Sequence, residues 1–393
     1  MNREIVLAAP VRTPIGRFGG GLAPLTAVDL GVTVARAAME RAHLPPDAIG
    51  QAIFGHARTA GCGPNPARQV SVRAGIPVEV PAYAINQACL SGLQAVLAAV
   101  RAVALGEAEI VLAGGMESMS RVPYLLPDAR WGLRMGHREI VDAMSRDGFF
   151  DPLSGMIMGE TAEVLAKRYG ISRAEQDAYA ALSQGRCERA RRLGLFRDEI
   201  VPVEVKDGKK TLVVEHDEHP RDGVTEASLA KLAPVFDAAG TVTAGNSSGI
   251  TDGAAAMLVL SREAAARQGI APVARVVGWR VVGVAPEIMG IGPVPAVKGV
   301  LSAHGLSLPD IDLVELNEAF AAQVIAVERD LGLDRERLNV NGGAIALGHP
   351  IGCSGARVLV TLLHEMARRG ARRGLATLCV SGGMGGALVV ERA

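Results

Sequence analysis

The sequence predicts an α/β protein made of two similar halves, with a segment of different composition inserted between them. Apolar runs typical of buried strands, at residues 4–9, 109–115 and 375–383, alternate with helical patterns along the chain. That alternation favours a largely buried sheet covered by helices. A chain of 393 residues also exceeds one ordinary core, so roughly two or three domains are expected.

An internal repeat supports the duplication. Pro46 and Ser91 in the first half correspond to Pro309 and Ser354 in the second half, both at an offset of 263 residues. Each serine opens a long helical pattern, and the glycine turns LAGGM and VSGGM then follow in the same order. Four landmarks that agree in order favour a duplicated unit over chance similarity of glycine-rich turns.

The segment 120–247 differs in composition from the rest of the chain and is predicted to be an insertion that covers part of the molecule. It is rich in Arg, Asp, Glu, Met and Pro. Ser172 and Glu175 have capping-box spacing for a charged helix that runs toward Arg192. The predicted division is an N-terminal half of residues 1–119 and 248–270, an inserted loop domain of 120–247, and a C-terminal half of 271–393.

Charge and composition argue against several kinds of partner. The 41 Lys and Arg residues balance 41 Asp and Glu residues, so no global field recruits nucleic acid or an anionic membrane. The short apolar run after Glu4 is predicted to be a strand and not a signal peptide. Arg101 interrupts the longest apolar stretch, so no membrane span is expected. Five cysteines without CxxC spacing favour a reducing, cytoplasmic setting.

Cys89 is the first candidate for chemistry. It lies in INQACLSGL, where a strand-like segment meets the start of a long helical pattern. Unpaired N–H groups and the helix dipole at such a position favour the thiolate, which is the nucleophilic form. The alternative is a small buried side chain, which is the commoner outcome for cysteine on residue type alone.

Three further residues lie in loops that suit a catalytic site. His349 stands among five glycines in NVNGGAIALGHPIGCSG, where few side chains obstruct a ligand. Cys379 precedes the glycine turn in LCVSGGMGG, whose backbone amides could face an oxyanion. Asn317 ends an apolar strand in VELNEAFAAQ, where it either orients a water or an imidazole or caps the following helix.

Together these motifs resemble the thiolase family of acetyl-CoA C-acyltransferases over essentially the whole chain. The matches are NQACLSG, NEAF, the glycine-rich segment through His349 and the turn after Cys379, in the family's order and spacing. The resemblance implies a five-layered α-β-α-β-α fold of two duplicated halves with an inserted loop domain. It also implies a homotetramer or dimer that uses coenzyme A thioesters as substrates, with no permanently bound cofactor and no metal.

The resemblance assigns a role to each candidate. Cys89 attacks a thioester or 3-oxoacyl carbonyl and becomes acylated, while His349 removes its proton. Cys379 takes an α-proton from the second acetyl-CoA, or returns it during cleavage. Asn317 holds a water that, with His349, stabilises the enolate. The backbone N–H groups of Cys89 and Ser381 would form a second oxyanion hole.

The resemblance also implies substrate contacts and an activity. Ser248 is expected near the pantetheine amide and Arg221 at the adenine end of CoA. The channel for pantetheine and the acyl group is expected to be lined by Met158, Ala319 and Phe320. The implied reaction is acyl transfer with reversible Claisen condensation in fatty acid metabolism, most simply the conversion of two acetyl-CoA to acetoacetyl-CoA and CoA.

Two positions depart from the family pattern. Ser381 replaces the usual glycine or alanine, and the oxyanion hole is expected to survive unless the turn requires positive φ there. Ile157 stands where short-chain biosynthetic members commonly have a histidine before Met-Gly. This second departure leaves open longer or branched 3-oxoacyl groups, and with them a degradative 3-ketoacyl-CoA thiolase.

Other activities are weaker alternatives. The GNSSG segment fits the GxSxG pattern of a serine hydrolase at Ser247, and Asp310 and His349 follow in triad order, but a broken turn and a strand follow instead of a helix. A decarboxylating ketoacyl synthase would pair its cysteine with two histidines. A non-catalytic acyl-CoA-binding protein would have no need of Cys89, His349 and Cys379 together.

Two histidine-containing segments and one cysteine are not expected to take part in chemistry. HDEH at 216–219 is expected to be a solvated loop with too few ligands for a metal, and HEMAR at 364–368 lacks the second histidine of a zinc-protease helix. Cys353 is expected to pack inside the second repeat helix.

Overall fold

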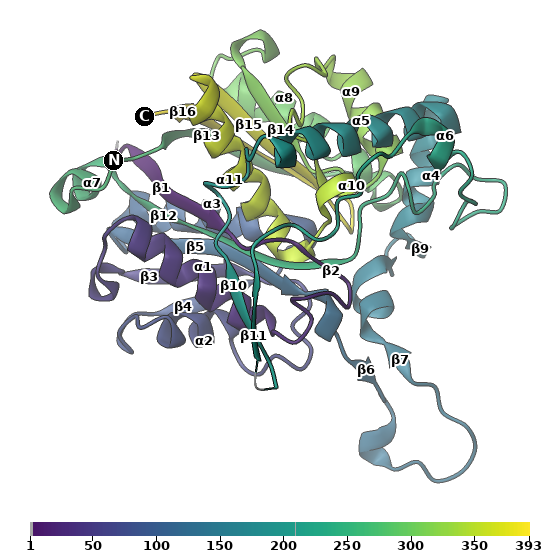
Figure 1. The fold of residues 1–393 in the computed structure, drawn as a ribbon, viewed down its shortest axis with the longest axis horizontal. Helices are drawn as coiled ribbons and strands as arrows, with labels where there is room; N and C mark the ends of the chain where they lie inside the picture. The colour runs from purple at the N-terminus through teal and green to yellow at the C-terminus, as the bar shows by residue number, and fades with distance from the viewer. Residues whose placement is uncertain (1–2, 209) are drawn as a thin grey trace.

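The fold is built on one sheet that divides into two halves. The computed structural model describes residues 3–208 and 210–393, and within them ten strands form a sheet in the order β14-β15-β16-β13-β1-β12-β5-β3-β4, with β2 (Gly16–Arg17) beside β12 (Figure 1). The pairing between β1 (Ile5–Arg12) and β13 (Ala274–Gly283) covers only Val6 with Arg275 and Leu7 with Ala274. The sheet therefore divides at this short contact.

The first half-sheet contains β1 and four other strands: β3 (Gln51–Gly55), β4 (Ala82–Ile85), β5 (Ile110–Ser118) and β12 (Thr251–Ser261). β5 and β12 are buried along their whole length, which explains why their apolar residues run continuously and do not alternate with polar ones. On one face lie α1 (Ala27–Arg41) and α2 (Pro66–Arg73), and on the other lies α3 (Ser91–Leu105).

The second half-sheet contains β13 and three other strands: β14 (Leu313–Leu316), β15 (Arg373–Val380) and β16 (Met384–Arg392). On its inner face α11 (Ile351–Arg369) packs against α3, and on its outer face lie α8 (Pro293–Ala303) and α9 (Ala321–Leu331). Three clusters of buried apolar side chains fill the spaces between these layers. The predicted five-layered fold of two duplicated halves is confirmed.

The insertion forms a cover and a projecting arm. Its longest elements are α4 (Met158–Tyr169), α5 (Arg173–Arg192) and the hairpin of β10 (Val203–Asp207) and β11 (Lys210–Val214). The predicted capping box is present, because Ser172 accepts from the N–H of Glu175 and α5 ends at Arg192. An arm that starts at β6 (Tyr124–Leu125) and returns at β7 (Val141–Asp142) extends away from the body (Figure 1).

Short elements complete the chain. They are β8 (Phe150–Asp151), β9 (Met156–Ile157), α6 (Glu226–Leu229), α7 (Arg262–Gln268) and α10 (Ala344–Leu347). β8 pairs with β9 in the insertion, and α10 lies just before His349.

The helix that follows Cys89 is the most apolar in the chain. Contrary to the expectation based on Arg101, the segment Ala88–Leu105 is long and apolar enough to cross a membrane by composition. In the structure, however, it lies between the two half-sheets, and most of its side chains belong to the central buried cluster. Arg101 places its guanidinium 5.4 Å from the ring centroid of Trp279. Burial in the central layer therefore accounts for its composition.

The expectation of a solvated loop at 216–219 is wrong for Asp217 and His219. Asp217 is buried, and its carboxylate accepts two hydrogen bonds from the guanidinium of Arg12 at 2.6 and 2.9 Å. Glu199 accepts a third, from Arg12 Nε, at 2.6 Å. Burial alone would lower the pKa of Arg12, but the two carboxylates outweigh it and raise the pKa. This buried ion cluster joins β1 to two points of the insertion.

Candidate active site

One cavity gathers most of the predicted site residues. It has a volume of about 480 Å³, within the usual range for small-molecule sites. Phe149, Ile157 and Phe236 from the insertion cover it with apolar side chains. The predicted residues that line it are Cys89, His349, Ser381, Ser248, Arg221, Met158, Ala319 and Phe320.

Cys89 lies on a strained turn between β4 and α3. The residue before it, Ala88, has φ of 45°, a left-handed conformation that is rare for a residue with a side chain. Two neighbouring side chains hold the turn: Asn86 Oδ1 accepts from the N–H of Ala88 at 3.0 Å, and Ser91 Oγ donates to its carbonyl at 2.7 Å. Strain that is held in this way is typical of functional sites, and here it turns the thiol into the cavity.

His349 is fixed in one orientation and one tautomer. Its N–H donates to the carbonyl of Gly249 at 3.0 Å, and its ring Nδ1 lies 2.5 Å from Ser354 Oγ. The single hydroxyl proton of Ser354 is donated to the carbonyl of Pro350 at 2.9 Å, so Oγ must accept from Nδ1–H. Nε2 is then unprotonated and available as a base.

Asn317 confirms this tautomer from the other side of the ring. It follows β14, and its Nδ2, which can only donate, lies 3.4 Å from His349 Nε2. Asn317 Oδ1 is buried without a hydrogen-bond partner among the described residues. Asn317 does not cap the next helix, because the N-cap of α9 is Phe320. Its side chain is therefore free to orient the imidazole or a bound water.

Cys379 lies beneath the cavity at the end of β15. Its side chain is fully buried against Met289, Ala319 and Phe320. Burial raises the pKa of the Cys379 thiol, and the nearby charge of a Cys89 thiolate raises it further. The two cysteines are thus close enough to influence each other, although they come from opposite halves of the chain.

The electrostatics of Cys89 differ from the sequence-based expectation. Burial raises the pKa of its thiol, although hydrogen bonding from the backbone N–H groups of Ser381 and of Cys89 itself partly opposes the shift. Burial also lowers the pKa of His349 to about 3, with help from the charges of Arg357 and Arg58. The expected thiolate at a helix start is wrong for the resting site, which holds a neutral thiol beside a neutral imidazole.

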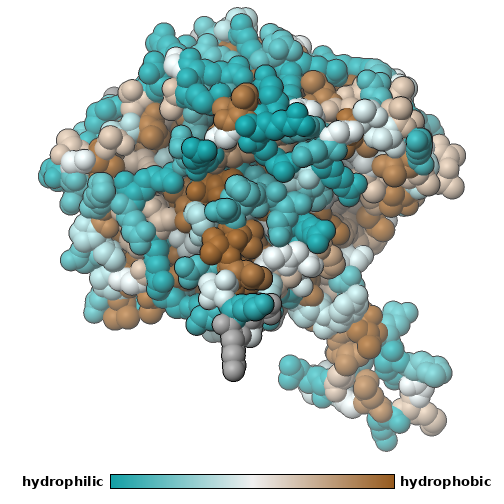
Figure 2. Space-filling view, in the orientation of Figure 1, coloured by the Kyte–Doolittle hydropathy of each residue, from teal (hydrophilic) through white to brown (hydrophobic). Residues whose placement is uncertain are grey.

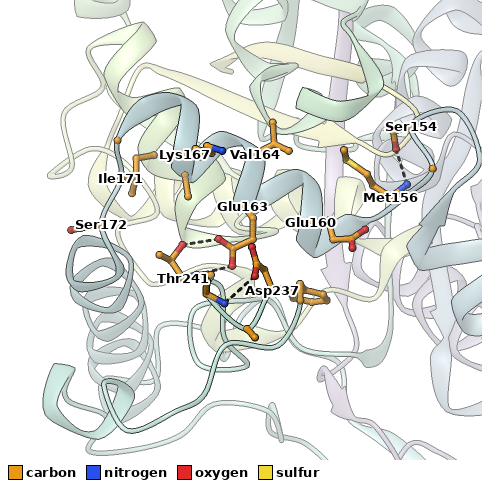
Figure 3. Close-up of a pocket in the computed structure, with 17 residues that line it drawn as sticks. Ser154, Met156, Glu160, Glu163, Val164, Lys167, Ile171, Ser172, Asp237 and Thr241 are labelled. Carbon is orange, nitrogen blue, oxygen red and sulfur yellow. Dashed lines mark hydrogen bonds between the residues drawn. The ribbon is translucent and has the colours of Figure 1, made fainter.

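A second pocket shows how the cover of the site is held. In Figure 3, Glu163 on α4 reaches across to the segment around Thr241. Its carboxylate accepts from the N–H groups of Thr241 and Val242 at 2.7 and 2.6 Å. The anchored segment carries Phe236, whose ring packs edge-to-face on Phe320 with centroids 6.3 Å apart. None of the candidate catalytic residues lines this pocket, so its role is to fix the cover.

Sequence reasoning missed His219 as a cavity residue. Its Nδ1 donates to the carbonyl of Ala346 at 2.8 Å, and its ring lies against Gly249, where a Cβ would collide with it. Burial lowers the pKa of His219, so its ring is neutral at neutral pH and Nε2, which lies against Gly249, is unprotonated. The sequence feature that could have indicated His219 is its position two residues before Arg221, which was expected to contact CoA.

The serine hydrolase arrangement is not assembled. Ser247 Oγ donates to the carbonyl of Thr243 at 2.7 Å, and strand β12 follows in place of the required helix. Asp310 is exposed and accepts a hydrogen bond from Ser307, whereas the Nδ1 partner of His349 is Ser354. Cys353 packs in the central core as expected. Within the described residues, no cluster of His, Cys, Asp and Glu is placed to hold a metal ion.

Comparison with known sequences identifies the family. Residues 5–263 match the thiolase N-terminal domain, and residues 270–392 match the thiolase C-terminal domain. The chain belongs to the thiolase family. The resemblance inferred from the motifs is confirmed.

Similar thiolases cover the whole chain. The acetyl-CoA acetyltransferase of Chromobacterium violaceum is 53% identical over 99% of this chain and 100% of that protein. The crystal structure of the Bacillus anthracis acetyl-CoA acetyltransferase has a TM-score of 0.98 at 46% identity, over 100% of this chain and 99% of that one. Human mitochondrial 3-ketoacyl-CoA thiolase in complex with CoA has a TM-score of 0.96 at 44% identity, over 100% and 98%.

Ser381, where the family pattern led us to expect glycine or alanine, fits its turn without strain. The positive φ angles of the turn fall on Gly382 and Gly383, at 84° and 82°, and Ser381 is not among the described non-glycine residues with positive φ. Its backbone N–H acts on the Cys89 sulfur together with the N–H of Cys89 itself. These are the two groups predicted to form the thiolase oxyanion hole, and the serine side chain does not prevent them from converging.

Because Cys89 and His349 are both uncharged in the resting site, we can predict how the rate of reaction with iodoacetamide depends on pH. Because the pKa of Cys89 is raised, the alkylation rate of its peptide should keep rising through about pH 8.5, the ordinary thiol value, without a plateau below pH 7. Rates would be followed by mass spectrometry of the Cys89 peptide, with the partly exposed Cys62 as an internal control. A plateau between about pH 5 and 7 that disappears in His349→Ala would instead indicate a thiolate–imidazolium pair.

Proposed function

We propose that this chain is an acetyl-CoA C-acetyltransferase, an acyltransferase that joins or cleaves a carbon–carbon bond through an acyl-cysteine. The observation that carries the proposal is that Cys89 and His349 line one apolar cavity, with Asn317 beside His349 and Cys379 buried against two other residues of the cavity wall, Ala319 and Phe320. The names of the similar bacterial proteins support it. A hydrolase would need water in the cavity, and acyl transfer to CoA benefits from its exclusion.

In the first step, Cys89 Sγ attacks the thioester carbonyl. His349 Nε2 accepts the thiol proton as the sulfur–carbon bond forms, and then gives it to the departing sulfur of CoA. The N–H groups of Cys89 and Ser381 stabilise the negative oxygen of the tetrahedral intermediate. The products are acyl-Cys89 and free CoA.

In the second step, Cys379, as its thiolate, removes an α-proton from a second acetyl-CoA. The enolate carbon attacks the carbonyl of acyl-Cys89, so that the new carbon–carbon bond forms and the bond from that carbon to Cys89 Sγ breaks. The departing Cys89 sulfur takes up the proton that Cys379 removed. Asn317 Oδ1, which lacks a partner, is placed to hold a water that donates to the enolate oxygen beside His349.

A degradative 3-ketoacyl-CoA thiolase of broader chain length is the second candidate. Ile157 favours it, because this apolar side chain lines the cavity at the position where short-chain members commonly have histidine. An isoleucine adds apolar surface and offers no hydrogen bond to a short polar acyl group. Thiolysis of 3-oxoacyl-CoAs of increasing length would test it, and activity confined to acetoacetyl-CoA would contradict it.

A homo-oligomer, tetramer or dimer, is the proposed assembly. The arm of residues 124–142 carries six exposed apolar side chains, among them Trp131 at 85% and Met135 at 84% exposure, and Figure 2 shows apolar surface on it. Exposed apolar surface of this extent is typical of association sites. We also propose a cytoplasmic location and a role in fatty acid metabolism, with acyl-CoAs as the small-molecule partners.

The arm predicts a measurable change in assembly. Wild-type protein should show a mass of more than one chain by light scattering, and Trp131→Ser with Met135→Ser should shift it toward smaller species, because each serine removes apolar contact area. Leu105→Ser is the matched control, since Leu105 is an isolated exposed side chain at the end of α3. A monomeric wild-type protein would contradict the assembly.

Substitutions of Cys89 and Cys379 should impair different steps of the reaction. Incubation with acetyl-CoA should acetylate Cys89, and Cys379→Ser should still acylate but lose condensation by about 10²–10⁴-fold, because only the second step needs its base. Cys62→Ser serves as the control, because Cys62 does not line the cavity. The measurements are peptide mapping and formation of acetoacetyl-CoA. Acetyl on a residue other than Cys89, or undiminished condensation by Cys379→Ser, would overturn the proposal.

A further inference from the structure

Arg58 is a buried cation in the wall of the catalytic cavity that none of the steps above uses. It follows β3, is only 7% exposed, and lines the cavity together with Cys89 and His349. Its Nε has no hydrogen-bond partner among the described residues. A guanidinium removed from water without a counter-ion is costly, and such departures are expected where function requires them.

The carboxylate that is bonded to the backbone N–H of Arg58, that of Glu117, is already occupied. Glu117 accepts from the backbone N–H groups of Ala57 and Arg58 at 3.2 Å each, and from that of Gly352 at 2.9 Å. Its Oε1 also lies 3.2 Å from His56 Nε2. Burial alone would lower the pKa of His56, but interactions with Cys62 and Glu117 raise it to about 9, so His56 is cationic at neutral pH and balances Glu117. Arg58 is left without a carboxylate.

The guanidinium is held at the reacting end of the cavity. It lies against Gly148 of the covering segment, where a Cβ would collide with the guanidinium and displace it. Its charge acts on both Cys89 and His349. Arg58 is therefore beside the acyl group that Cys89 would carry. Arg221, which also lines the cavity, is the contact expected for the adenine end of CoA.

We propose that Arg58 is a specificity-determining residue that binds a carboxylate on the acyl chain, so that the substrates include CoA thioesters of 3-oxo dicarboxylic acids. An acetyl group has no anion to offer, whereas a terminal carboxylate can form the paired hydrogen bonds that a guanidinium favours. The inference rests on the proposed thiolase reaction and names the acyl group that it transfers.

The chemistry balances with the residues already described. Cys89 Sγ attacks C3 of the 3-oxo thioester as His349 Nε2 takes the thiol proton, and the bond between C2 and C3 breaks. The leaving enolate of acetyl-CoA takes a proton from Cys379. Cys89 then carries the carboxylated acyl chain, with its carboxylate at Arg58, until the sulfur of CoA takes the acyl group. The thiol proton of CoA and the proton held by His349 restore the two cysteine thiols.

The experiment compares two substrates of equal length. Wild-type thiolysis would be measured with the CoA thioester of a six-carbon 3-oxo dicarboxylic acid and with its neutral 3-oxohexanoyl counterpart. The acidic substrate should have the higher kcat/KM. Arg58→Met should lower kcat/KM for the acidic substrate by about 100-fold and change that for the neutral substrate much less, because it removes one partner of a buried charge pair.

Two further variants keep the result interpretable. Gly148→Ala displaces the guanidinium without removing it and should reduce the acid preference in part, while Arg58→Lys should retain some of it. Arg146→Met is the matched control, because Arg146 is an exposed arginine paired with Asp147 in the same covering segment. Its ratio of the two substrates should equal that of wild type.

The outcomes separate this inference from the proposed function. A wild-type preference for the neutral substrate would overturn the inference and leave the thiolase reaction intact. An equal loss for both substrates in Arg58→Met would also overturn it, and would assign the charge to Cys89 and His349 instead. A wild-type enzyme that cleaves neither substrate nor acetoacetyl-CoA would overturn the proposed function, and the inference with it.

Discussion

The site depends on the close contact between α3 and α11, the two helices that the duplication places in the central layer. A Cβ on Gly92 would lie 2.7 Å from the backbone N of Ala356, and one on Gly355 would collide with the backbone N of Leu93. Glycines allow these two helices to touch, and their N-terminal ends then meet. Cys89 and His349, each at one of these ends, are brought together by backbone contact between the two halves of the chain.

Burial then sets the chemistry of the residues that meet there. The same loss of water that raises the pKa of Cys89 lowers the pKa of His349, so the resting pair carries no charge. Charge develops only when a thioester is present, at a position already faced by the N–H groups of Cys89 and Ser381. Stabilisation by groups that need no reorganisation is most effective in such a dry site. The apolar cover formed by the insertion is therefore part of the catalytic apparatus.

Local sequence patterns predicted the fold, because the repeat offset revealed the duplication. They also pointed to four residues in contiguous motifs that the structure brings near one another. The protonation state of Cys89 was mispredicted, since its helix-start position is local but its burial is a property of the whole fold. Asp217 looked solvated in a charged segment because its partner Arg12 is 205 residues away. Arg58 gave no signal either, because no sequence pattern shows that Glu117 is already bound by His56.

Both steps of the reaction use the same cavity. The acyl group bound to Cys89 must therefore lie outside the channel through which the second thioester enters. Acyl-Cys89 and acetyl-CoA must both approach Cys379 and His349, so their chains have to diverge at the sulfur. Arg58 and Gly148 lie against each other in the wall of the cavity, which Ser248, Ala319 and Phe320 also line. A carboxylate bound to Arg58 would hold the acyl chain out of the channel during the second step. The unpaired guanidinium of Arg58 is therefore better explained by a two-step reaction, in which it holds the first acyl group aside, than by the binding of a single substrate.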